Sequence, residues 1–147
     1  MPITGSCRCG GVTYQLACEA LPATYVCHCL DCQTWSGSAF AEHALLAEDT
    51  IQLDGETVTY KHGREEFLSE QVICRTCHTR IYNRNGAVPG MIVLRAGTLS
   101  ASDKLTPVAH IWVKRKQGWV VIPDDVPSWP ESPTPQEFGE ALRQAQA

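Results

Sequence analysis

A chain of 147 residues with 44% apolar and 19% charged side chains has the length and composition of one globular domain, which excludes a disordered or fibrous protein. Its net charge of −4 argues against a nucleic-acid partner, because phosphate binding needs clustered Lys and Arg. The first residues lack the basic and apolar regions of a signal peptide, and no apolar run is long enough to span a membrane. We therefore expect a single cytoplasmic domain over residues 1–147 that binds neither membranes nor nucleic acid.

The spacing of apolar residues predicts a mainly β fold. Val12, Tyr14 and Leu16 alternate with polar residues, which is the period of a half-buried strand. Other extended segments are expected at the apolar and β-branched runs 23–26, 38–46, 57–60, 67–73, 91–94, 110–113 and 120–122. A short helical turn is expected over 34–37, where Gly37 closes it.

The C-terminal residues 123–147 predict a proline-rich arm and a short helix outside a core of about residues 3–122. Prolines are frequent up to Pro135, which favours an irregular segment. Thr134 is then a suitable N-cap, with Pro135 in the first helical position. The apolar residues that follow have helical spacing: Phe138, Ala141, Leu142 and Ala145.

The eight cysteines predict metal binding. Seven of them form the clusters Cys7/Cys9, Cys27/Cys29/Cys32 and Cys74/Cys77. In a cytosolic chain, closely spaced cysteines are typical of metal sites rather than disulfides, and thiolate ligands favour zinc. Cys18 stands apart and is expected to be a small buried side chain.

The stretch 27–32 offers three thiolates to a single ion. On an extended backbone Cys27 and Cys29 point to the same face, with His28 on the other face, and Cys29 and Cys32 have the spacing of a tight metal-binding turn. Three protein ligands with one exchangeable position are the catalytic pattern of zinc. A fourth protein ligand from elsewhere, such as Cys18, would instead make the site structural.

The spacing does not decide how the seven cysteines divide between sites. Cys7 and Cys9 could join Cys74 and Cys77, which keeps each cluster intact and leaves the stretch 27–32 as an open site. They could equally join Cys29 and Cys32.

Three ordered motifs make the chain resemble the glutathione-dependent formaldehyde-activating enzyme family over about residues 3–122. They are Gly5-x-Cys7-x-Cys9-Gly10-x-Val12-x-Tyr14, then Cys27-His28-Cys29-x-x-Cys32 with Gly37, then Cys74-x-x-Cys77. The segment 107–119, with His110 and Trp119, is also similar. One departure is His78, where the family usually has glycine.

The resemblance implies a zinc-stapled β-tent of small antiparallel sheets with two zinc ions. Cys7, Cys9, Cys74 and Cys77 would match the structural zinc, and Cys27, Cys29 and Cys32 the second, exchangeable zinc. The implied activity is that of a carbon–sulfur lyase, which condenses formaldehyde with glutathione to S-hydroxymethylglutathione. The partners would be a small thiol, such as glutathione, and an aldehyde.

In that reaction a zinc with an open position would hold the thiol as its thiolate. The candidates for the general acid are His28, His43, His62 and His110, and residue type alone does not choose among them. Trp35 could line the pocket, although tryptophan is more often part of a core. The alternatives are a non-catalytic binding module with two structural zincs, an enzyme for another thiol or aldehyde, and redox chemistry at Cys74 and Cys77.

Overall fold

The computed structural model describes residues 2–146 and is mainly β, with strands in two sheets and two α-helices, which confirms the predicted fold class. The chain divides into two compact units. The first unit comprises the residues up to Pro22 together with Ala44–Leu105, and the second comprises Ala23–His43 together with the residues from Thr106 on. Neither helix of the described chain is long and apolar enough to cross a membrane.

A three-stranded antiparallel sheet opens the first unit. Its strands are β1 (Ile3–Ser6), β2 (Thr13–Leu16) and β5 (Ile51–Asp54), with β2 in the centre. The alternation predicted for this segment is present, because Tyr14 and Leu16 are buried while the residues between them are exposed.

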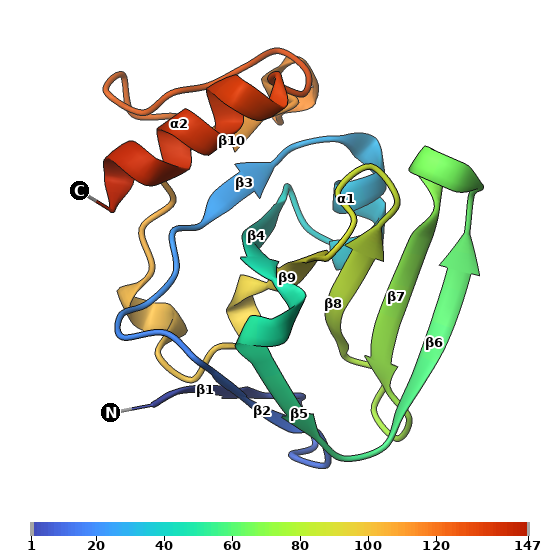
Figure 1. Cartoon of the computed structure of the whole chain (residues 1–147). Coiled ribbons are helices and arrows are strands. Elements are labelled where there is room, and N and C mark those ends of the chain that lie inside the picture. Colours follow the sequence, from blue (N-terminus) through green and yellow to red (C-terminus); the bar gives the residue numbers. More distant parts are fainter. Residues whose placement is uncertain (1, 147) are drawn as a thin grey trace. The chain divides into compact units, whose positions relative to one another are not determined.

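Four further strands of the first unit lie side by side in the order β6-β7-β8-β9 (Figure 1). They are β6 (Thr57–His62), β7 (Ser69–Cys74), β8 (Arg80–Asn85) and β9 (Met91–Arg95), each antiparallel to its neighbour. Cys74 ends β7, so the Cys74–Cys77 motif forms the connection into β8.

The core of the first unit joins the two groups of strands. Val12, Ile81, Ile92 and Leu94 are fully buried in one apolar cluster. The same cluster contains Cys7 and Cys74, one from each cysteine motif of this unit. The two motifs are therefore held near each other by the packing of the core as well as by their own chemistry.

The second unit is built around β3 (Tyr25–Cys27). This strand pairs antiparallel with the start of β4 (Ala41–Ala47) and parallel with the two-residue strand β10 (His110–Ile111). The parallel pair is an exception to the antiparallel pairing that the family resemblance implies. Helix α1 (Leu30–Ser36) follows β3 and ends at Gly37, whose φ of 65° lies in the left-handed region that favours glycine.

Helix α2 (Pro135–Ala145) is the predicted C-terminal helix. The Thr134 hydroxyl accepts from the Glu137 N–H at 3.1 Å, and the Glu137 carboxylate accepts from the Thr134 N–H at 3.0 Å, which completes a capping box. Its Phe138 packs edge-on against Tyr25 of β3, with 4.7 Å between ring centroids.

Several predicted extended segments are wrong in extent. The segment 110–113 is a strand only to Ile111, because Trp112 has a φ of 59° and a 3₁₀ turn, Val113–Arg115, follows. The N–H groups of residues 112–114 bond to carbonyls of residues 129–131 instead of a sheet ladder. The run 120–122 is no strand, since the Val120 N–H bonds to Gln117 in a turn. Similarly, β4 begins only at Ala41 and β7 only at Ser69.

Replacing Ile92 by alanine should lower the free energy of unfolding by about 2–5 kcal/mol, because Ile92 is fully buried and its removal leaves a cavity. Val121→Ala is the control, since Val121 is 87% exposed and its change should stay within about 0.5 kcal/mol. Urea unfolding of the metal-loaded variants measures both. Equal effects would contradict the assignment of Ile92 to the core.

Candidate metal centre

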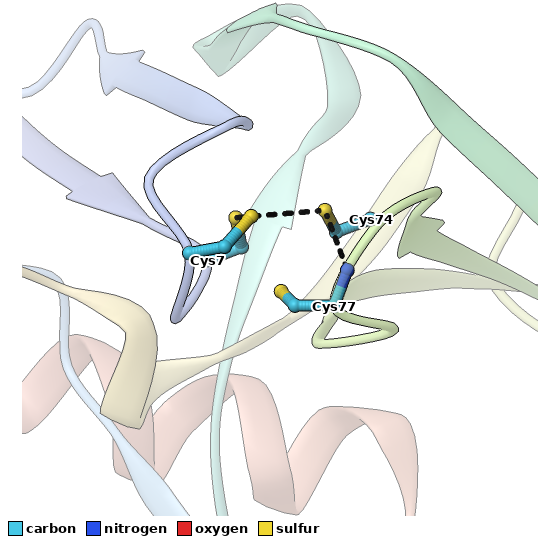
Figure 2. Close-up of side chains that lie close together, drawn as sticks. Cys7, Cys74 and Cys77 are labelled. Atoms are coloured by element: carbon cyan, nitrogen blue, oxygen red, sulfur yellow. Dashed lines mark hydrogen bonds between the residues drawn. The ribbon is translucent and has the colours of Figure 1, made fainter.

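Four sulfur atoms of the first unit converge on one point. The Sγ atoms of Cys7, Cys9, Cys74 and Cys77 all lie within 4.8 Å of one another. Figure 2 shows the side chains of Cys7, Cys74 and Cys77 turned toward each other. Sulfurs that hold one zinc tetrahedrally at ~2.3 Å are about 3.8 Å apart. The separations of 3.5 Å between Cys7 and Cys9 and 3.8 Å between Cys9 and Cys74 fit that spacing.

The backbone of residues 7–12 turns toward its own sulfurs. The Val12 N–H donates to Cys7 Sγ at 3.3 Å, and the Gly11 N–H donates to Cys9 Sγ at 3.4 Å. Gly10 makes this turn possible with a φ of 80°. Amide donors of this kind stabilise the thiolate form that a metal requires.

In the second motif of this cluster, Cys74–Cys77, a backbone N–H also donates to sulfur, and a threonine hydroxyl contacts the other sulfur. The Cys77 N–H donates to Cys74 Sγ at 3.5 Å (Figure 2). The Thr79 hydroxyl lies 3.1 Å from Cys77 Sγ, and this hydroxyl and the Thr79 backbone lower the pKa of Cys77 to about 5. The Arg8 N–H donates to the Thr79 hydroxyl at 3.2 Å, which links the two motifs. No motif in the sequence points to Thr79 as a partner of these cysteines.

The position that departs from the family pattern has an unusual backbone. His78 has a φ of 63°, in the left-handed region, and its N–H donates to the Cys74 carbonyl at 3.0 Å. Glycine adopts this conformation without strain, which explains why it is the usual residue of the family here. The motif folds with histidine, so the departure does not displace the sulfurs.

A second cluster of three sulfurs lies in the second unit. The Sγ atoms of Cys27, Cys29 and Cys32 lie within 4.8 Å of one another. Cys27 ends β3, Cys29 is the N-cap of α1, and the Cys32 N–H donates to Cys29 Sγ at 3.3 Å. Hydrogen bonds from the thiols of Cys27 and Cys32 hold the pKa of Cys29 well below its usual value.

Each cluster includes a backbone turn. Cys7 and Cys9 lie in a turn after β1, where the N–H groups of residues 11 and 12 bond to their sulfurs. The turn expected between Cys29 and Cys32 is the first turn of a helix, because a cysteine at the N-cap accepts from the free N–H groups there.

The division of the cysteines that spacing left open is visible in these groups. Cys7 and Cys9 gather with Cys74 and Cys77, and the stretch 27–32 forms its own cluster. Over residues 2–146, no further cysteine, histidine or carboxylate joins the group of three. Cys18 belongs to neither group and packs, half-buried, against the core of the first unit. The donor sets can therefore hold metal ions, one with four thiolates and one with three.

His28, which lies between Cys27 and Cys29 in the sequence, is fully buried and not on the surface. Its Nε2 lies 3.0 Å from His110 Nδ1, and the two rings stack with 5.3 Å between centroids. Burial, together with the charges of His110 and Lys116, lowers the pKa of His28 to about 4. A neutral His28 thus joins β3 to β10 and fixes the backbone between Cys27 and Cys29.

The other residues singled out by the sequence lie in both units. His43 is buried in β4 with its ring edge-on to Tyr25, and Trp35 is half-buried in α1, so both belong to the unit that holds the group of three. His62 lies on β6 of the first unit. Sequence reasoning missed Gln33, whose Nε2 donates to the carbonyls of His28 at 2.8 Å and Arg115 at 2.9 Å.

A polar groove of about 660 Å³ lies over the three-stranded sheet of the first unit. It is lined by hydroxyl, amide and carboxylate side chains, among them Thr4, Ser6, Gln52 and Asp54. None of the lining residues is a cysteine, so this groove presents no sulfur to a ligand.

The sequence over residues 2–115 matches the family of the glutathione-dependent formaldehyde-activating enzyme. The chain belongs to this family. The matched segment contains both clusters and covers most of the chain.

No curated protein matches the sequence. Among solved structures, a crystal structure of a Rhodobacter sphaeroides protein from structural genomics is similar, with a TM-score of 0.55 and 17% identity. The similarity covers 86% of this chain and 99% of that chain, and at this identity it concerns the fold alone.

Replacing Cys74 by serine should release one metal ion per chain and lower the melting temperature of the protein. The variant loses a ligand that lies in the core and accepts from the Cys77 N–H. Metal analysis and calorimetric melting measure the two effects, with Cys18→Ser as the control outside both clusters. Unchanged metal content and melting in Cys74→Ser would contradict the four-sulfur site and favour redox chemistry at Cys74 and Cys77.

Replacing His78 by glycine should raise the free energy of unfolding by about 1 kcal/mol, because only glycine adopts a positive φ without strain. The His78 side chain is exposed, so little packing is lost. His78→Val should have the opposite effect, since β-branched residues tolerate this region least. Urea unfolding at constant metal content provides the comparison. A glycine variant less stable than the valine variant would contradict a backbone origin.

Proposed function

We propose that this protein is a zinc-dependent enzyme of the carbon–sulfur lyase type that joins a thiol, such as glutathione, to formaldehyde or a related aldehyde. Two zinc ions per chain are proposed, one held by Cys7, Cys9, Cys74 and Cys77 and one by Cys27, Cys29 and Cys32. The first would be structural and the second would take the substrate thiol. The proposed compartment is the cytoplasm, where free cysteines and glutathione coexist.

The observation that carries the proposal is the group of three sulfurs in the second unit. Four thiolates complete a tetrahedral site, whereas three leave one position for an exchangeable ligand. The family name supports a thiol and an aldehyde as the reactants. Thiolates also favour zinc over harder metals.

A zinc ion held by the three cysteines would bind the substrate thiol in its open coordination position. It would lower the pKa of that thiol and so supply the thiolate nucleophile at neutral pH. The three cysteine thiolates leave the site with net negative charge, which disfavours polarising an aldehyde and favours activating a thiol. In the addition, the sulfur forms a bond to the carbonyl carbon, and the carbonyl π electrons move to oxygen, which then takes a proton. The product contains all atoms of the thiol and the aldehyde.

The chain's own residues position the open cluster. Cys29 is fixed as the cap of α1, and Cys27 is fixed at the end of β3. The buried pair of His28 and His110 links β3 to the neighbouring strand, so the backbone between these two cysteines cannot shift without breaking a hydrogen bond. Rigid support of this kind would hold the three sulfurs in place for a metal ion.

Calorimetric titration of the zinc-loaded protein should show binding of glutathione but not of γ-glutamyl-alanyl-glycine, which lacks the sulfur. Replacing Cys29 by serine should abolish this binding, because it removes a ligand of the open site, while Cys18→Ser should bind as the unchanged protein does. A formaldehyde assay of the proteins that bind glutathione then tests the reaction.

Two results would count against the proposal. Equal binding of both peptides would mean that the sulfur is not what the protein recognises. Binding of neither would favour a non-catalytic zinc-stabilised module.

A further inference from the structure

A row of three cations lies at the same end of the second unit as the three-sulfur cluster. β10 runs parallel to β3, with Ile111 opposite Cys27. Because parallel strands end at the same edge, the residues that follow Ile111 and those that follow Cys27 leave the sheet together. The first set contains Lys114, Arg115 and Lys116, and the second contains Cys29 and Cys32.

Gln33 connects the two segments directly. This residue lies in α1 next to Cys32, and its Nε2 is shared between the carbonyl oxygens of His28 and Arg115. The His28 N–H also donates to the Ile111 carbonyl at 3.0 Å. The turn that carries the cations is therefore attached to the backbone of the metal-binding stretch at two points.

The three cations are not equivalent. Lys114 forms an ion pair with Glu131, and its ammonium lies 5.1 Å from the centre of the Trp112 ring. Among the described residues, Arg115 and Lys116 have no ion-pair partner, and Arg115 is exposed. Lys116 is half-buried. Two positive charges without an ion-pair partner therefore lie on the turn that Gln33 and the His28 N–H attach to the metal-binding stretch.

Positive charges at this place would stabilise a bound anionic ligand. Zinc held by three thiolates would be negatively charged overall, and a substrate bound as its thiolate would add to that charge. A thiol that also carries carboxylates, as glutathione does, would be repelled unless cations lie nearby. The guanidinium of an arginine binds a carboxylate in a bidentate manner, and a lysine adds a point charge.

We propose that Arg115 and Lys116 form a carboxylate-binding subsite that selects carboxylate-bearing thiols for the three-sulfur cluster. This inference rests on the function proposed above. It makes the turn after β10 a determinant of substrate specificity and assigns no proton transfer to it. Small thiols without a carboxylate gain nothing from the subsite.

The test compares two thiols by calorimetric titration of the zinc-loaded protein. Glutathione carries carboxylates, and N-acetylcysteamine carries a thiol but no charge. Arg115→Ala should raise the Kd of glutathione by about 10- to 100-fold, the range expected for loss of a charge-assisted hydrogen bond. The Kd of N-acetylcysteamine should change less than about twofold. Lys116→Ala should act in the same direction, and Arg115→Lys should recover part of the loss.

Two controls separate charge from structure. Lys114→Ala changes the same turn at a cation that already has a partner, and Lys104→Ala removes an exposed cation of the first unit. Both should leave the Kd of glutathione nearly unchanged. Zinc content and melting temperature of each variant show whether the fold is intact.

The outcomes are distinct. A loss for glutathione alone supports the subsite. An equal loss for both thiols, or no loss for either, overturns it. If the unchanged protein binds N-acetylcysteamine and binds glutathione no more tightly, the open thiol site stands and the subsite is wrong. If the unchanged protein binds neither thiol, the proposed function is wrong and the subsite fails with it.

Discussion

The first unit depends on the meeting of four sulfurs at one point. Cys7 and Cys9 come from the turn after β1, and Cys74 and Cys77 come from the connection between β7 and β8. Thiolates this close repel one another unless a cation lies between them, so the geometry favours a bound metal. A metal there would also close a long loop of chain, which makes the unfolded state less favourable. The buried positions of Cys7 and Cys74 make the site continuous with the apolar core.

The same kind of hydrogen bond supports both cysteine clusters. In each, backbone N–H groups point at sulfur and favour the charged ligand. In the first unit two turns supply four sulfurs, and Thr79 adds a hydroxyl bond that joins them. In the second unit a strand end and a helix N-terminus supply only three. The difference in number separates a set of four sulfurs, which completes a tetrahedron, from a set of three.

The second unit shows how a very short strand can organise a site. β10 has two residues, yet it brings the stretch after Ile111 alongside the stretch after Cys27. The stacked pair of His28 and His110 and the shared amide of Gln33 hold these stretches together. Because the histidine pair is buried and His28 is neutral, it stabilises the site without adding charge beside the thiolates. Positive charge is supplied instead by the exposed turn.

Local features of the sequence determined several of the strands, the terminal helix and the three cysteine motifs. The alternation at 12–16, the Thr134 cap with Pro135, and Gly37 after α1 all act over a few residues, and the structure follows them. Only the tertiary structure decided which cysteine motifs meet, because that depends on strand order and core packing. The same holds for the early end of β10, where backbone bonds to residues 129–131 overrode β-branched side chains. It holds as well for the burial of His28 and the reach of Gln33, since their partners lie about eighty residues away along the chain.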